Sequence, residues 1–213
     1  MTEEPNPMDP FHATTGPACP LMAANVDTDV IVRIQRLTDL EPDALGPYAF
    51  ETWRYRPDGT PDPAFVLNRP PWTDATILLA GPNFGCGSSR EGAVWALKAF
   101  GIRAIIAPSF GAIFYNNMFQ NGMMPVVLPA PDIEALAGIA RAQPDAPFQV
   151  DLQRQVVVPP NGTPLPFEVE ARRREALLNG LDDLGLTLKR DAQITSFEGA
   201  DRQARPWAHE PGA

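Results

Sequence analysis

The chain has 213 residues, of which 44% are hydrophobic and 20% charged, and this composition fits one globular domain with at most a small appendage. Its formal net charge of −9 argues against a nucleic acid or an anionic membrane surface as partner. No apolar run approaches the roughly 20 residues of a membrane span, and the acidic N-terminus lacks the pattern of a signal peptide. We therefore expect a cytoplasmic protein.

Cysteine and histidine are too scarce for the common metal and triad chemistries. The chain has two cysteines, Cys19 and Cys86, which cannot form a disulfide scaffold or a four-thiolate metal site. His12 and His209 lie near opposite ends of the sequence, so a histidine metal site or a Ser-His-Asp triad is poorly supported. We therefore expect no cofactor in this chain.

The order of predicted elements indicates an α/β protein with a mainly parallel sheet. Residues 1–16 are predicted to be a loose arm, residues 17–197 one domain and residues 198–213 a polar tail. Buried strands over 75–80, 102–109 and 124–129 alternate with helices over 90–100 and 111–123, which is a β-α-β-α-β pattern. The other predicted elements are a loop and a short strand or helix over 25–37, an irregular stretch over 38–72, a helix over 132–143 capped by Asp132, two strands around the Asn-Gly turn within 148–170, and a helix within 171–188 that ends near Asn179–Gly180.

The stretch GPNFGCGSSRE, residues 81–91, places small and polar residues on a strand-to-helix turn. A helix that begins near Ser88 or Ser89 leaves its first backbone N–H groups unpaired, and those donors favour an anion. Arg90 adds a planar guanidinium suited to a carboxylate or a phosphate. The turn therefore indicates an oxyanion or carboxylate site at the carboxyl end of a parallel strand. A helix cap with serine as N-cap explains the same residues without a ligand.

The common phosphate and nucleophile motifs do not fit this turn. A P-loop needs a lysine before its serine or threonine, the dinucleotide pattern G-x-G-x-x-G is not completed, and G-x-S-x-G is absent. Cys86 lies near the expected helix start, where a thiol can be activated, but no suitable histidine accompanies it. We therefore expect Cys86 to pack in the turn.

Four segments in order carry a resemblance to a known family: ANVDTDVIV, NFGCGSSRE, APSFGAIFYNN and NGLDDLGLTL. Together they resemble the small subunit of bacterial 3-isopropylmalate dehydratase, which is similar to the mobile swivel domain of aconitases. The resemblance runs from about residue 16 to residue 197. It implies a three-layer β/β/α swivel domain with a mainly parallel central sheet.

The resemblance also implies a function. The chain would belong to a hydro-lyase of leucine biosynthesis that acts on a small hydroxy-polycarboxylate, and it would be active only with a large subunit. That partner would carry a four-iron–four-sulfur cluster whose iron acts as a Lewis acid on the leaving hydroxyl. On the family pattern Ser88 is the base, Ser89 and Arg90 hold substrate oxygens, and Thr28 and Asp29 line the same site.

Three positions depart from the family pattern and leave the substrate open. Arg33 and Ile34 replace a Pro-Lys pair, Gly92 stands where the family usually has histidine, and residues 38–50 lack the usual arginine. The same chemistry on citraconate/2-methylmalate or on a dimethylmalate is the nearest alternative. Alternatives of other classes are a non-catalytic interaction module and a free-standing phosphate-binding domain.

Several other side chains have simple structural explanations. Asp27 and Asp29 fit local Asx turns, and the aromatic group Phe110, Phe114 and Phe119 fits core packing. The run Arg172–Arg174 fits a solvated helix face.

Overall fold

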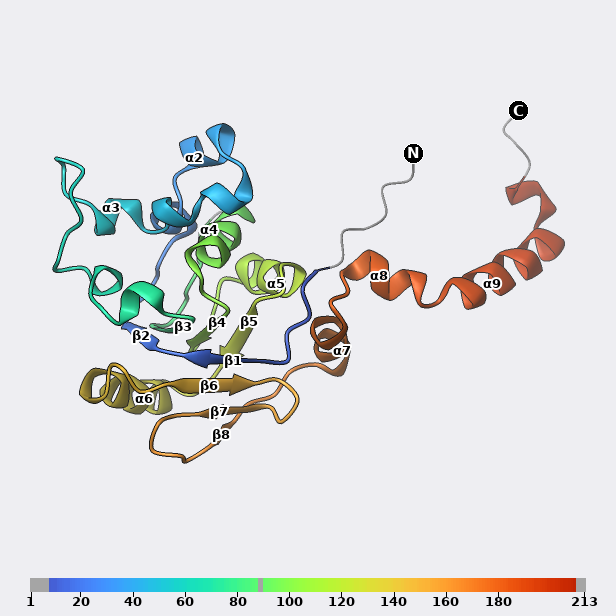
Figure 1. Ribbon diagram of the computed structural model, residues 1–213. Coiled ribbons are helices and arrows are strands. Elements are labelled where there is room, and N and C mark those ends of the chain that lie inside the picture. Colours follow the sequence, from blue (N-terminus) through green and yellow to red (C-terminus); the bar gives the residue numbers. More distant parts are fainter. Residues whose placement is uncertain (1–7, 88–89, 210–213) are drawn as a thin grey trace.

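The computed structural model describes residues 8–87 and 90–209, with the backbone alone described for Asp183 (Figure 1). Its strands form a parallel sheet of order β2-β3-β4-β5 and an antiparallel sheet of order β1-β6-β7-β8. The parallel sheet consists of β2 (Ala18–Leu21), β3 (Ile77–Ala80), β4 (Ala104–Ala107) and β5 (Met124–Val127). The antiparallel sheet consists of β1 (Ala13–Gly16), β6 (Phe148–Asp151), β7 (Val156–Val158) and β8 (Leu165–Pro166).

Helices fill the connections between these strands. Between β2 and β3 lie α1 (Thr28–Ile31), α2 (Ile34–Asp39), α3 (Glu51–Arg54) and the 3₁₀ turns η1 (Pro42–Ala44), η2 (Gly46–Tyr48), η3 (Val66–Asn68) and η4 (Trp72–Asp74). After β3, β4 and β5 come α4 (Gly92–Phe100), α5 (Ala112–Gln120) and α6 (Ala130–Ala142). The chain continues past β8 with α7 (Ala171–Asn179), α8 (Asp183–Leu188), α9 (Asp191–Ala204) and η5 (Pro206–Ala208). In the described part of the chain, every helix is too short or too polar to cross a membrane.

The parallel sheet is buried on both faces, and this burial creates the three layers. In β3, Ile77 and Leu79 belong to the hydrophobic cluster shared with α6 and the antiparallel sheet. Leu78 and Ala80 belong to the cluster shared with α4. Because neighbouring strand residues point to opposite faces, one strand supplies both cores. Figure 1 shows α4 and α5 on one side of the parallel sheet and the antiparallel sheet on the other, so the predicted β/β/α order is confirmed.

The predicted β-α-β-α-β pattern is present as β3-α4-β4-α5-β5. Gly180 caps the end of α7 at a φ of 63°, in the region that glycine tolerates best, as its sequence position predicts. The Asn-Gly turn joins β7 to β8, but β6 was not foreseen as a third strand of this sheet. The helix α6 begins before Asp132, which lies in the first turn and does not cap it.

The predicted domain boundaries near the two ends of the chain, after residue 16 and after residue 197, differ from the structure. Residues 13–16 are not part of a loose arm, because β1 pairs with β6 and Phe11 is 2% exposed in the core. The first seven residues of that predicted arm lie outside the described part. The predicted tail from residue 198 begins inside α9, so the boundary at 197 does not separate domain from tail.

Candidate active site at the carboxyl edge of the parallel sheet

The turn 81–91 follows β3 and is held against the loop that follows β2. The backbone N–H of Gly85 donates to the carbonyl of Val26 at 2.8 Å, and Thr28 N–H donates to the carbonyl of Cys86 at 2.9 Å. Since β2 and β3 are parallel neighbours, both loops leave the sheet at the same edge. Residues almost 60 positions apart in sequence are thereby brought into contact.

The loop after β4 holds the other side of the turn. Phe84 N–H donates to the carbonyl of Ser109 at 3.1 Å, and Gly111 N–H donates to the carbonyl of Phe84 at 2.9 Å. The Ser109 hydroxyl also accepts from the backbone N–H of Asn83 at 2.9 Å, and the Asn83 side chain donates to Asn25 Oδ1 at 2.8 Å. The turn is therefore fixed from both flanking loops.

Two glycines allow this close approach. Gly87 has a φ of 98°, and a Cβ there would lie 2.7 Å from the carboxylate carbon of Asp27. Gly85 has a φ of 70°, and a Cβ there would collide with the ring of Phe114. Both positions combine a left-handed backbone with no room for a side chain, so the glycines are explained by the packing of the turn.

The segment Asp27–Thr28–Asp29 lies beside the turn and begins α1. Asp27 caps this helix by accepting from the backbone N–H of Asp29 at 2.7 Å, so its interpretation as an Asx turn is confirmed. Thr28 is 1% exposed. The Asp29 side chain, 57% exposed, forms an ion pair with Arg90, whose side chain is 22% exposed. The structure therefore brings Thr28, Asp29 and Arg90 together from two separate segments.

The helix after the turn begins later than the sequence suggests. The first residue of α4 is Gly92 and its N-cap is Glu91, so the expected start near Ser88 or Ser89 is wrong. Ser88 and Ser89 themselves lie outside the described residues. Compared with the helix predicted over 90–100, α4 begins two residues later, because Arg90 still precedes the N-cap. The left-handed Gly85 and Gly87 belong to the turn before it.

Asn121 fixes the start of α4 and was not singled out from the sequence. Its amide donates to Glu91 Oε1 and to the carbonyl of Asn117, each at 2.8 Å, and its oxygen accepts from the indole N–H of Trp95 at 3.0 Å. This side chain joins the end of α5 to the beginning of α4 directly after Arg90. An asparagine followed by a glycine is common at the end of a helix, so the sequence alone carries no sign of these contacts.

Gly92 lies in a tightly packed position. It is buried, and a Cβ there would lie 2.7 Å from Leu37 Cδ1 and 3.0 Å from Leu37 Cγ. Gly92 is the first residue of α4, where a glycine weakens the helix less than it does in the interior. The departure at this position is therefore accommodated by Leu37 of α2.

The departures at Arg33 and Ile34 lie at the start of a helix, in a segment where the sequence left a strand or a helix open. Ile34 is the first residue of α2 and Arg33 is its N-cap. Arg36 donates to Glu51 at 2.9 and 3.1 Å, lies over the ring of Tyr48 at 4.1 Å, and has a raised pKa because of its hydrogen bond to Glu51. Arg33 reaches the same carboxylate at 3.7 Å.

A hollow of about 670 Å³ lies over this arginine pair. Its lining includes Arg33, Arg36, Tyr48, Glu51 and Arg56. Although residues 38–50 carry no arginine, arginines on either side of them reach this surface. The acidic segment is thus bordered by positive charge.

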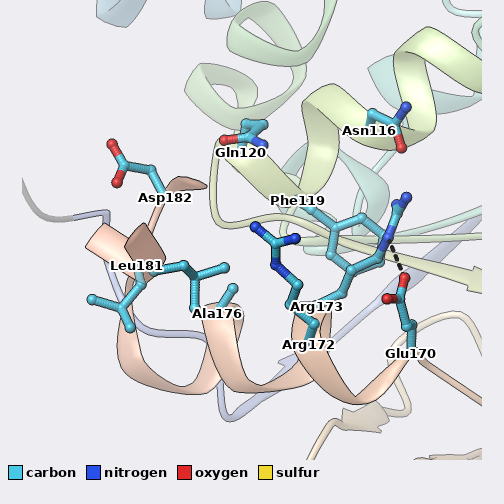
Figure 2. Close-up of a pocket in the computed structure, with 10 residues that line it drawn as sticks. Asn116, Phe119, Gln120, Glu170, Arg172, Arg173, Ala176, Leu181 and Asp182 are labelled. Carbon is cyan, nitrogen blue, oxygen red and sulfur yellow. Dashed lines mark hydrogen bonds and ion pairs between the residues drawn. The ribbon is translucent and has the colours of Figure 1, made fainter. Parts of the chain in front are cut away.

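A second hollow, of about 320 Å³, lies between α5, α7 and α8 (Figure 2). Arg173 pairs there with Glu170 at 3.3 Å and lies 4.9 Å from the ring centre of Phe119. Arg174 donates to the carbonyl of Gln153 at 2.6 Å. The prediction of a plain solvated face for Arg172–Arg174 is therefore wrong for Arg173 and Arg174. Thr28, Asp29 and Arg90 do not line this hollow.

The predicted aromatic packing is confirmed for the buried members of the group. Phe114 and Phe119 are 2% and 7% exposed and belong to the two different hydrophobic clusters, and Phe110 is partly buried against the cluster of Phe114. The ring of Phe114 meets the ring of Phe84 edge-on at 5.6 Å, directly under the turn. Phe84 and Phe114 therefore pack beneath the turn.

The described residues do not fit an iron–sulfur cluster. Within ranges 8–87 and 90–209, no group of three or more His, Cys, Asp or Glu side chains could hold a metal ion. Cys19 is fully buried, and burial raises the pKa of its thiol, which disfavours the thiolate that a cluster needs. Cys86 is half-buried, and its backbone pairs with the loop after β2.

Comparison with known proteins identifies the family of the chain. Residues 8–131 match the aconitase C-terminal domain, residues 134–171 match LeuD_N, and residues 183–209 match the C-terminal domain of the 3-isopropylmalate dehydratase small subunit. The 3-isopropylmalate dehydratase small subunit of Cupriavidus necator is 50% identical over 208 residues, which cover 96% of this chain and all of the relative. The chain belongs to the family of 3-isopropylmalate dehydratase small subunits.

Further members of the small-subunit family agree with this assignment. The small subunit of Rhodospirillum centenum is 48% identical over 201 residues, 94% of this chain and 99% of the relative. The crystal structure of 3-isopropylmalate dehydratase (leuD) from Methanocaldococcus jannaschii matches with a TM-score of 0.62 and 29% identity, covering 86% of this chain and 99% of that one. The resemblance carried by the four sequence segments is confirmed.

Proposed function

We propose that this small subunit supplies the base and part of the carboxylate grip of a heteromeric hydro-lyase of the 3-isopropylmalate dehydratase type, in cytoplasmic leucine biosynthesis. The near-full-length relatives named as small subunits support the reaction class and imply a large subunit as partner. The observation that carries the site assignment is the meeting of Thr28, Asp29 and Arg90 beside the turn that contains Ser88 and Ser89.

Asp29 and Arg90 have different parts in this proposal. A carboxylate such as Asp29 repels a polycarboxylate substrate, so its contact with the guanidinium of Arg90 defines its role better than a direct substrate contact does. Arg90 has five N–H donors and retains some of them for a substrate carboxylate while it pairs with Asp29. We assign substrate binding to Arg90 and Ser89, and the orientation of Arg90 to Asp29.

Ser88 is the proposed base, which moves the proton between substrate carbon and enzyme. A serine hydroxyl is almost fully protonated at neutral pH, because its pKa is high, as is that of bulk water at about 15.7. Lowering that pKa by one unit requires about 1.4 kcal/mol of stabilisation of the deprotonated form. A helix N-terminus contributes about 2 kcal/mol at most, and α4 begins four residues after Ser88 in sequence, so its contribution is smaller than that. The remaining stabilisation requires Arg90, backbone N–H donors and a site closed against water by the partner.

The other half of the site is assigned to the large subunit. Since the described residues of this chain do not fit a cluster, we place the four-iron–four-sulfur cluster on the partner, where it would act as a Lewis acid on the leaving hydroxyl. Thr28, Asp29, Ser88, Ser89 and Arg90 then form the half of the site that belongs to the small subunit. Substrate binds between the two chains.

The substrate is proposed to be 3-isopropylmalate, with citraconate/2-methylmalate and a dimethylmalate as alternatives on the same chemistry. A leucine auxotroph that lacks its small subunit and expresses the cognate large subunit tests this choice. We expect this chain to restore growth without leucine, and the Ser88→Ala variant to fail. No growth, together with turnover of another malate by the purified pair, would assign the alternative substrate.

A further inference from the structure

The C-terminal arm consists of residues 183–209; its first helix, α8, borders the hollow beside α5 and α7, and α9 stands away from the rest of the described chain (Figure 1). In α9 every side chain is exposed except Asp201, which is partly exposed and pairs with Arg205 and His209 inside the arm. The arm is held at its base by an ion pair between Lys189 and Glu175 of α7 at 3.0 Å. Ile194, near the start of α9, borders a hollow with Arg172 and Glu175 of α7, and the helix beyond it extends into solvent.

The arm carries more exposed apolar surface than its length predicts. Among the described residues eight large hydrophobic side chains are exposed, and five of them belong to the arm: Leu184, Leu188, Ile194, Phe197 and Trp207. Ile194 and Phe197 are three positions apart and so share one face of α9. A single helix of this length is marginal in water unless a tertiary contact covers its apolar face.

Charge does not account for the arm. It contains four acidic and four basic residues and is formally neutral, whereas the whole chain carries −9. A neutral arm with an apolar face fits a contact driven by burial of Ile194 and Phe197 better than one driven by ionic attraction.

The family matches indicate which molecule covers this face. The aconitase C-terminal domain matches residues 8–131, and the arm matches a separate family model, the C-terminal domain of the 3-isopropylmalate dehydratase small subunit. A domain that is part of a longer chain is kept near its partner domain by covalent connection, whereas a separate subunit depends on contact alone. A separate small subunit needs a non-covalent contact with the large subunit in place of the covalent connection, and the arm could provide that contact. The first residues of the arm lie next to α7, and α7 packs on α5. At the end of α5, Asn121 donates to Glu91 at the start of α4.

We propose that the C-terminal arm docks on the large subunit through Ile194 and Phe197. The proposal rests on the proposed function, because it requires a large subunit as partner. The arm would determine the affinity between the two subunits, and the proposed site residues around Ser88 would determine the turnover of the assembled pair.

The test uses the full-length chain, its cognate large subunit and the double variant Ile194→Asp/Phe197→Asp. Both side chains are exposed in the small subunit, so its own fold should persist, which circular dichroism checks. We expect affinity for the large subunit to fall at least tenfold, with kcat restored at saturating large subunit. The control Ala192→Asp/Ser196→Asp adds the same charge to the other face of α9 and should change affinity less than twofold.

Three results would overturn the docking role. The first is an unchanged affinity of the Ile194→Asp/Phe197→Asp variant for the large subunit, and the second is an equal loss of affinity in the control. The third is self-association of the wild-type chain that this variant abolishes, because the apolar face of α9 would then be covered by a second copy of the chain. If the wild-type chain forms no complex at all, the proposed function fails as well. A wild-type complex that tolerates the variant contradicts the arm alone.

Discussion

Replacing Ser88 with alanine should lower kcat of the assembled enzyme by about 10²- to 10⁴-fold, the range that a positioned general base contributes. The affinity between the subunits should remain within twofold of wild type, because the change removes one hydroxyl oxygen and no apolar contact. Steady-state kinetics of the reconstituted pair measures kcat, and a titration of one subunit with the other measures the affinity.

Cys86→Ala is the matched control for this prediction. Cys86 lies two residues before Ser88 in the same turn, and its contacts to the loop after β2 are made by the backbone. We expect its kcat to stay within about twofold of wild type. Full turnover by the Ser88→Ala complex would instead support a non-catalytic interaction module.

The second large effect is expected at Arg90. Each hydrogen bond from a charged group is worth about 1.5–3 kcal/mol, so loss of a two-bond contact in Arg90→Ala should reduce kcat/KM by about 10²- to 10⁴-fold, at about 1.4 kcal/mol for each tenfold step. Arg90→Lys keeps the charge but loses the planar geometry and should recover only part of that loss. Initial rates over a range of substrate concentrations separate the effects on kcat and KM.

Asp29→Asn tests whether Asp29 acts through Arg90. The variant keeps the shape of the side chain but removes the charge that pairs with the guanidinium. We expect about a tenfold loss in kcat/KM, and a much smaller loss when Arg90 is already alanine, because the two residues then share one role. A loss from Asp29→Asn that persists undiminished in the Arg90→Ala background would show that Asp29 acts independently of Arg90.

The parallel sheet could be predicted from the sequence because the strands of a doubly covered parallel sheet are continuous apolar runs, whereas the three-layer order was expected only from the family resemblance. Ile77–Ala80 and Ala104–Ala107 are such runs, and both are strands that are buried on each face. The antiparallel sheet was harder to predict. β1 depends on pairing with β6, which is more than 130 residues away, and a four-residue segment with little apolar content gives no local sign of that partner.

The sequence predicts candidate site residues, but it does not predict the tertiary contacts between their segments. The sequence indicated the turn, the two glycines and the DTD segment, but the parallel bridge between Asp27 and Cys86 depends on the tertiary fold. The same is true of the Asn121 brace, since the partners Glu91 and Trp95 lie on another helix. The start of α4 was misplaced because serine favours an N-cap in general, whereas here Glu91 occupies that position.

The central claim is that this chain holds half of an active site and that a large iron–sulfur partner holds the other half. Its most direct test is the turnover of 3-isopropylmalate by the purified small subunit, by the purified cognate large subunit, and by the two together. We expect no turnover by the small subunit alone and full turnover by the mixture. Sustained turnover by the small subunit without any iron–sulfur partner would contradict this claim.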